Sequence, residues 1–175
     1  MRLLKEELAS SERLVGVKRL CLIFIAGFVV SIQSSSQSAT VEASSATQIG
    51  DLEQSLCKQA AASNGMAGAS LAEYPGHYTQ LIFRDKSGEV EIHQQFDEIM
   101  IVISGNAMVK TGGTPENLRT VKPGELRGTA TRGGTSTAME KGNLVHIPAT
   151  TPHQVIVPAG GFVTYIDVKI AHSGS

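Results

Sequence analysis

The feature that most constrains the fold of this chain is a series of short apolar runs, closely spaced and separated by Gly- and Pro-containing turns, that follows Gly68. Runs of this length and spacing predict the strands of a β-sandwich or β-barrel. No helical stretch lies between them, which disfavours a doubly wound α/β fold. We therefore expect an all-β domain, with strands over residues 77–84, 89–93, 98–104, 107–110, 143–147, 153–157 and 162–170.

One helix is expected before the strands, over residues 51–65. Leu52, Leu56 and Ala60 follow a helical stripe, and an Asn-Gly pair at the end of the segment is a stop signal. We expect this short N-terminal helix to pack on the outside of the β domain. Residues 40–50 are rich in Ser, Thr and Ala, and this composition predicts a disordered linker.

Residues 1–39 have the organisation of a secretory signal peptide. A basic start is followed by the apolar run 20–32 and by a small polar exit that contains Ser36 and Ser38. The apolar run is shorter than the about 17–25 residues of a membrane-spanning helix. We therefore expect cleavage, export to the periplasm or the medium, and no stable membrane insertion afterwards. If the segment is not cleaved, the protein is expected to be membrane-anchored.

The charge distribution argues against two classes of partner. The chain has 15 Lys and Arg residues against 16 Asp and Glu residues, a formal net charge of −1 at pH 7. Its basic residues are scattered along the sequence. Neither a nucleic-acid surface nor a polybasic membrane patch is therefore expected.

Two short segments gather imidazole and carboxylate groups, the donors that a divalent transition metal prefers. Residues two apart in a strand face the same way, so Glu91 and His93 share a face. Glu98 opens the next expected strand and can lie beside His93 across an antiparallel pair. His153 follows two prolines that stiffen its approach. If the two segments meet in space, the sequence predicts a metal site.

The first segment resembles the first motif of the cupin superfamily, which has the form G-x5-H-x-H-x3,4-E-x6-G. Glu98 is followed by six residues and then by Gly105, as in the motif. Counting back, His93 takes the second histidine position and Glu91 takes the first. A second register is open, with His93 at the first histidine position, Gln95 at the second and a shortened loop.

The second segment resembles the second cupin motif, G-x5-P-x-G-x2-H-x3-N. Gly142, Pro148 and His153 stand at the spacing that this motif requires. Thr150 replaces the usual glycine and Val157 replaces the asparagine. This segment is the more specific of the two, and the resemblance covers nearly all of the strand-rich part of the chain.

The resemblance implies a double-stranded β-helix, or jelly-roll barrel, over residues 70–171, and it implies that a homodimer is common. It also implies that one divalent transition metal, with Fe, Mn or Zn expected, is bound by His93, Glu98 and His153. Glu91 stands in place of the missing histidine. Two alternatives remain for this residue: it is a fourth metal ligand, or it is a polar residue in the wall of the site.

Four further residues are candidates for the walls of the ligand pocket. We expect Gln95, Met100 and His146 to lie there, without a role as ligands. Arg127 either clamps a carboxylate of the ligand or is a structural arginine in an ordered loop.

Cupins include dioxygenases, isomerases, decarboxylases and non-catalytic binders, so the fold does not determine the function. The sequence favours a metal-dependent enzyme of dioxygenase or isomerase type that acts on a small organic molecule. The alternative is an exported, non-catalytic protein that binds a small molecule or a metal. A structural domain with a vestigial site is a third hypothesis.

The export prediction has a direct test. Expression of the full sequence followed by mass spectrometry of the purified chain should show that it begins near residue 40, because the signal peptide has been removed. A product that keeps all of residues 1–39 and stays in the cytoplasm contradicts the prediction.

Overall fold

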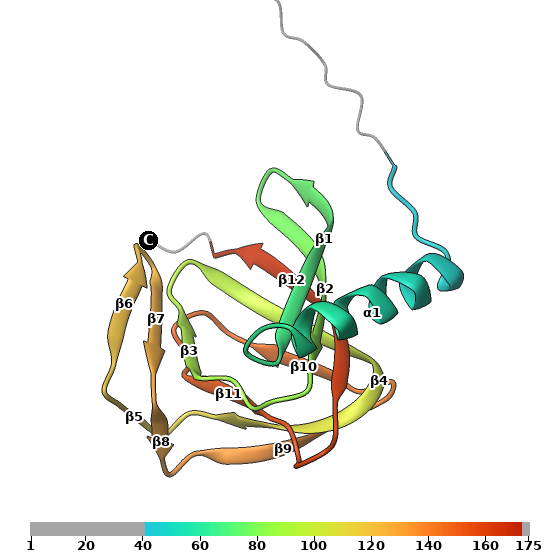
Figure 1. Cartoon of the computed structure of the whole chain (residues 1–175). Helices are drawn as coiled ribbons and strands as arrows, with labels where there is room; N and C mark the ends of the chain where they lie inside the picture. Colours follow the sequence, from blue (N-terminus) through green and yellow to red (C-terminus); the bar gives the residue numbers. More distant parts are fainter. Residues whose placement is uncertain (1–40, 173–175) are drawn as a thin grey trace, which may run out of the picture. The chain divides into compact units, whose positions relative to one another are not determined.

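The structure is a computed structural model that describes residues 41–172. The predicted signal peptide therefore lies outside the described residues. Within this range the chain forms an all-β domain with one helix (Figure 1). In the described part of the chain, no helix is both long and apolar enough to cross a membrane.

The secondary structure consists of one helix followed by strands. The helix α1 covers Ala46–Ala61. The strands are β1 (Met66–Tyr74), β2 (His77–Arg84), β3 (Val90–His93), β4 (Phe96–Thr111), β5 (Thr114–Glu116), β6 (Arg119–Lys122), β7 (Glu125–Gly128), β8 (Ala130–Arg132), β9 (Thr135–Glu140), β10 (Leu144–Ile147), β11 (His153–Ile156) and β12 (Val163–Ala171).

Ten strands form one curled antiparallel sheet in the order β1-β2-β12-β4-β11-β3-β7-β6, with β9 and β10 also paired to β4, and β5 and β8 form a separate two-stranded sheet. Strand β4 belongs to both halves of the barrel. Its first half pairs with β12 and β10, and its second half pairs with β9 and β11. Figure 1 shows how this long strand passes from one side of the barrel to the other. The predicted jelly-roll barrel is confirmed.

The predicted separation of strands 98–104 and 107–110 is wrong, because β4 continues through Gly105 without a turn. Gly105 has a φ of +69°, and a Cβ atom there would lie 2.2 Å from the carbonyl oxygen of Phe162. The register between β4 and β12 also shifts beside this point. Gly105 is thus a bend inside a strand, where the backbone of β4 closely approaches the chain that leads into β12.

Two groups of apolar side chains hold the barrel together. Inside it, a core cluster contains Ile82, Met100, Val102, Ala107, Val109, Met139, Ile147, Val155, Val157, Val163 and Tyr165. On the outer face of β1 and β2, Leu56 and Ala60 of α1 pack against Leu81 and Phe83. Side chains along β2 alternate between the two faces of the sheet and this explains both clusters, since Leu81 and Phe83 face the helix while Ile82 faces the interior.

The helix begins earlier than the sequence analysis expected, at Ala46, and it ends at Ala61. Ser45 is its N-cap: the Ser45 hydroxyl accepts from the Gln48 backbone N–H, and the Gln48 side chain accepts from the Ser45 N–H. This capping box converts residues 46–50 of the expected linker into helix. The Glu53 carboxylate then ties the helix to the sheet, because it accepts a hydrogen bond from Thr164 at 2.7 Å.

Gly105→Ala tests the bend in β4. The substitution forces an unfavourable φ and a clash with the Phe162 backbone, so we expect a loss of about 2–5 kcal/mol in the free energy of unfolding. Gly112→Ala is the matched control, because Gly112 has a φ of +72° with nothing within 4 Å of the added Cβ. It should lose only about 1–2 kcal/mol. Urea denaturation measures both, and equal losses would show that the close approach is unimportant.

Candidate metal centre

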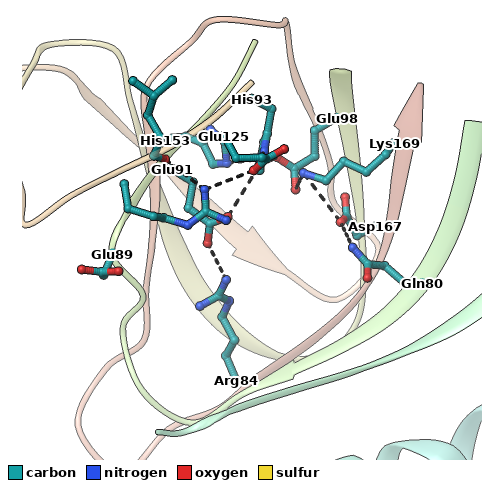
Figure 2. A network of polar contacts seen from close by, with 12 residues as sticks. Gln80, Arg84, Glu89, Glu91, His93, Glu98, Glu125, His153, Asp167 and Lys169 are labelled. Atoms are coloured by element: carbon teal, nitrogen blue, oxygen red, sulfur yellow. Dashed lines mark hydrogen bonds and ion pairs between the residues drawn. The ribbon is translucent and has the colours of Figure 1, made fainter. Parts of the chain in front are cut away.

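A polar cavity of about 240 Å³ lies inside the barrel. Its walls come from strands on both sides of the barrel, and Figure 2 shows the polar contacts around it. The lining residues are Met66, Tyr78, Gln80, Ile82, Arg84, Glu91, His93, Glu98, Met100, Lys122, Glu125, Arg127, Tyr165, Asp167 and Lys169. A cavity of this size is slightly smaller than the about 300–1,000 Å³ that is typical of ligand sites.

The two segments singled out in the sequence meet at this cavity. His93 ends β3, Glu98 lies in β4 and His153 begins β11. Glu98 Oε2 lies 3.5 Å from His93 Nε2 and 3.0 Å from His153 Nε2. Glu91 joins them, because donor atoms of Glu91, His93 and His153 all lie within 4.8 Å of one another. The structure thus brings all four predicted ligands together.

The hydrogen bonds of the two imidazoles fix which nitrogen faces the centre. His93 Nδ1 lies 2.6 Å from Glu125 Oε2, and His153 Nδ1 lies 3.1 Å from the carbonyl oxygen of Thr151. Both partners are acceptors, so each Nδ1 carries a proton and donates it. In the neutral imidazole the Nε2 atom then presents a lone pair to the cavity. This carboxylate–histidine arrangement is typical of metal-bound histidines.

Three buried donor atoms at the centre lack a hydrogen-bond partner among the described residues. They are His93 Nε2, Glu98 Oε2 and His153 Nε2. Burying such atoms without a partner is costly, and a lone pair facing a lone pair is repulsive. A cation placed among the three atoms satisfies all of them at once. The donor set therefore fits a divalent transition metal.

A proton is the competing occupant, and it fits less well. Burial opposes protonation of His153, but the contact with Glu98 outweighs it and raises the pKa of His153. Burial and the charge of Lys169 lower the pKa of His93. A proton on His153 therefore satisfies the contact with Glu98 but leaves the Nε2 atom of His93 without a partner.

Glu98 also belongs to a buried ion pair on its other side. Its Oε1 atom lies 2.8 Å from Lys169 Nζ, and both residues are buried. Burial opposes ionisation of Glu98, but His153 and Lys169 together hold its pKa well below the ordinary value. Next to this pair, burial and the charge of Glu98 raise the pKa of Asp167 to about 8.

Glu91 is already paired with two arginines. Its Oε1 atom accepts from Arg84 at 2.7 Å, and its Oε2 atom lies 3.2 Å from Arg127 and 3.5 Å from His93 Nε2. Burial opposes ionisation, but the two guanidinium groups keep the pKa of Glu91 below its ordinary value. Glu91 therefore lies at the rim of the donor set as the counter-ion of Arg84 and Arg127.

The three residues expected in the pocket wall have different positions. Met100 is buried and lines the cavity. Gln95 and His146 are exposed and do not line it. His146 faces outward because Ile147, its neighbour in β10, is the buried residue. Glu91, and not Gln95, accompanies His93 at the cavity, as in the first register of the motif.

Four cavity residues that matter for the charges were not predicted, namely Arg84, Tyr165, Asp167 and Lys169. The sequence signal for Tyr165, Asp167 and Lys169 was the alternation of side chains between the two faces of the final strand. Tyr165, Asp167 and Lys169 are two residues apart and share the buried face with Val163. Charged residues on an apolar face indicate a polar cavity, but their partners lie in other strands and cannot be read from one sequence.

Comparison with known proteins adds the following. No protein-family model matches the chain, and no curated protein matches it. Solved structures similar to it include KdgF from Halomonas sp. (17% identity, TM-score 0.46, 63% of this chain and 82% of that chain). A cupin-2 domain structure from Rhodospirillum rubrum has 15% identity and a TM-score of 0.46, and it covers 63% of each chain. Another is the DMSP lyase DddQ from Ruegeria pomeroyi DSS-3 (12% identity, TM-score 0.46, 63% of this chain and 49% of that chain).

Because these TM-scores are below 0.5, the likenesses carry no argument about ligand or reaction. The jelly-roll barrel is established by the strand order and register of this chain. The candidate metal centre rests on the positions of His93, Glu98 and His153.

Lys169→Met tests the buried ion pair. It leaves the Glu98 carboxylate buried without a cation, so we expect the metal-free protein to lose about 3–5 kcal/mol in the free energy of unfolding. Added Zn²⁺ should restore part of this loss, because the metal replaces the missing positive charge. Urea denaturation with and without Zn²⁺ measures both effects. Lys141→Met, at an exposed lysine, should leave stability nearly unchanged, and an equal loss there would contradict the assignment.

Proposed function

We propose that the barrel binds one divalent transition metal through His93, Glu98 and His153, and that the protein is a metal-dependent enzyme acting on a small organic molecule. The observation that carries the proposal is the convergence of three buried, unpartnered donor atoms, those of His93, Glu98 and His153, of which the first two line the cavity. Fe, Mn and Zn suit this donor set.

The chain's own residues are arranged to hold such a metal and a ligand. Glu125 and the Thr151 carbonyl orient the imidazoles, and Lys169 directs Glu98 Oε2 toward them. Two histidines and one carboxylate leave coordination positions open, as in non-haem Fe(II) oxygenases. When bound, the metal would supply Lewis-acid or oxygen-activating chemistry. The likeness of the donor set favours a reaction of dioxygenase or isomerase type.

A second candidate is an exported, non-catalytic protein that captures a small molecule or a metal. The observation that favours it is the charge compensation of the cavity. Glu98 is already paired with Lys169, and Glu91 is paired with Arg84 and Arg127. A site compensated in this way is stable without a tightly held catalytic metal.

Elemental analysis of the purified full chain tests the proposal. Protein grown with Fe, Mn and Zn should contain about one metal per chain. His93→Ala and His153→Ala should each weaken metal binding more than about 100-fold, because each removes a ligand whose supporting contacts alone are typically worth about 10–100-fold. His146→Ala is the control and should keep full metal content, because His146 is exposed. No stoichiometric metal in the parent protein rejects the enzyme proposal.

Water access to the metal separates the two candidates. If the protein is an enzyme with open coordination positions, the Mn²⁺-loaded form should enhance the relaxation rate of water protons through exchangeable bound water. Addition of a ligand analogue should reduce the enhancement. A loaded protein with no enhancement has a closed site, and this result favours the non-catalytic binder.

A further inference from the structure

A second cavity, of about 330 Å³, lies beside the cavity of the metal centre. It is lined by Asn64, Met66, Arg84, Lys86, Ser87, Gly88, Glu89, Glu91 and Arg127. Four of these residues, Met66, Arg84, Glu91 and Arg127, also line the first cavity. The ion-paired side chains of Arg84, Glu91 and Arg127, which we call the shared wall, therefore face both cavities.

The two arginines of the shared wall differ in how tightly they are held. Arg84 is 8% exposed, and its contacts with Glu91 at 2.7 Å and with the Tyr165 hydroxyl at 3.1 Å fix it in place. Arg127 is 23% exposed, its contacts with the carboxylates of Glu91 and Glu125 are both 3.2 Å, and it also donates to the Leu126 carbonyl at 2.9 Å. Charge-assisted N–H···O bonds are ordinarily about 2.7–2.9 Å. Arg127 is thus the more accessible cation of the wall, and its bonds to the carboxylates are longer than the bond between Arg84 and Glu91.

With a divalent metal bound, the charges around the first cavity favour a negative ligand. Among the described residues, four cationic side chains line it, namely Arg84, Lys122, Arg127 and Lys169, and four acidic side chains oppose them, namely Glu91, Glu98, Glu125 and Asp167. Even with all four carboxylates ionised, these groups only balance one another. A divalent metal at the centre would therefore leave two positive charges without a counter-ion in a small, largely buried space, which favours an anion.

We propose that Arg127 anchors an anion-binding subsite that takes a carboxylate group of the small organic ligand. The proposal deepens the proposed function and rests on it for the ligand's entry into the cavity. The planar guanidinium fork matches a carboxylate in two parallel hydrogen bonds. The ligand's carboxylate accepts hydrogen bonds from the two Nη atoms of Arg127, in place of their 3.2 Å contacts with Glu91 and Glu125. Arg84 still compensates the charge of Glu91.

The register of the sheet supports this role. Arg127 of β7 lies opposite Glu91 of β3 on one side and opposite Arg119 of β6 on the other. Arg119 pairs with Glu89 at the surface, is 51% exposed and lines neither cavity. Two arginines in neighbouring strands thus have different surroundings, and only Arg127 reaches the metal centre's cavity. Arg119 is a matched control.

The experiment is isothermal titration calorimetry on the full chain, with and without Zn²⁺, using malonate and its neutral analogue malonamide as probes. Malonate should bind at least tenfold more tightly than malonamide. Arg127→Gln should weaken malonate binding at least tenfold, Arg127→Lys should weaken it less, and Arg119→Gln should change it less than twofold. Circular dichroism checks the folding of each variant, and Arg127→Lys serves if Arg127→Gln does not fold.

The outcomes separate this inference from the proposed function. Equal binding of malonate and malonamide, or unchanged malonate binding by Arg127→Gln, overturns the subsite even if Zn²⁺ binds with one ion per chain. Malonate binding that depends on Arg127 supports the subsite. If such binding occurs in a protein that takes up no metal, the subsite stands while the metal-dependent function fails.

Discussion

Strand register is the constraint on which the site depends. Its contacts are made between residues that lie directly opposite each other in antiparallel pairs: Glu91 with Arg127, His93 with Glu125, and Glu98 with Lys169. A shift of one residue in the pairing of β3 with β7, or of β4 with β12, would turn these side chains to the other face of the sheet. The apolar core clusters fix the register, because the same shift would expose them. The packing that fixes the register of the barrel therefore also assembles the site.

The carboxylate of Glu98 links the two halves of the site electrostatically. One of its oxygens contacts Lys169, and the other faces His93 and His153. Lys169 already compensates the charge of Glu98, so the barrel does not depend on a metal to balance this buried carboxylate. The same lysine lies close to the metal position and should weaken metal affinity by repulsion, while it holds the carboxylate in the orientation that a metal needs.

The sequence was sufficient to predict the all-β fold and the convergence of Glu91, His93, Glu98 and His153, because motif spacing and the period of two in a strand carry that information. It was not sufficient for the ion pairs, since Lys169 is far from Glu98 in sequence and is recognised only through register. The bend at Gly105 was misread because a glycine at positive φ serves a turn and a bent strand equally well.

The central claim is that two imidazoles and one carboxylate of this chain bind one metal ion. X-ray absorption at the metal edge of the Zn²⁺-loaded protein tests it most directly, because imidazole rings give a distinct scattering pattern beyond the first shell of ligands. The account predicts two imidazole nitrogens near about 2.0–2.1 Å, with the remaining ligands being oxygen. A spectrum with oxygen ligands alone, or with imidazole scattering that persists in the double variant His93→Ala/His153→Ala, would contradict it.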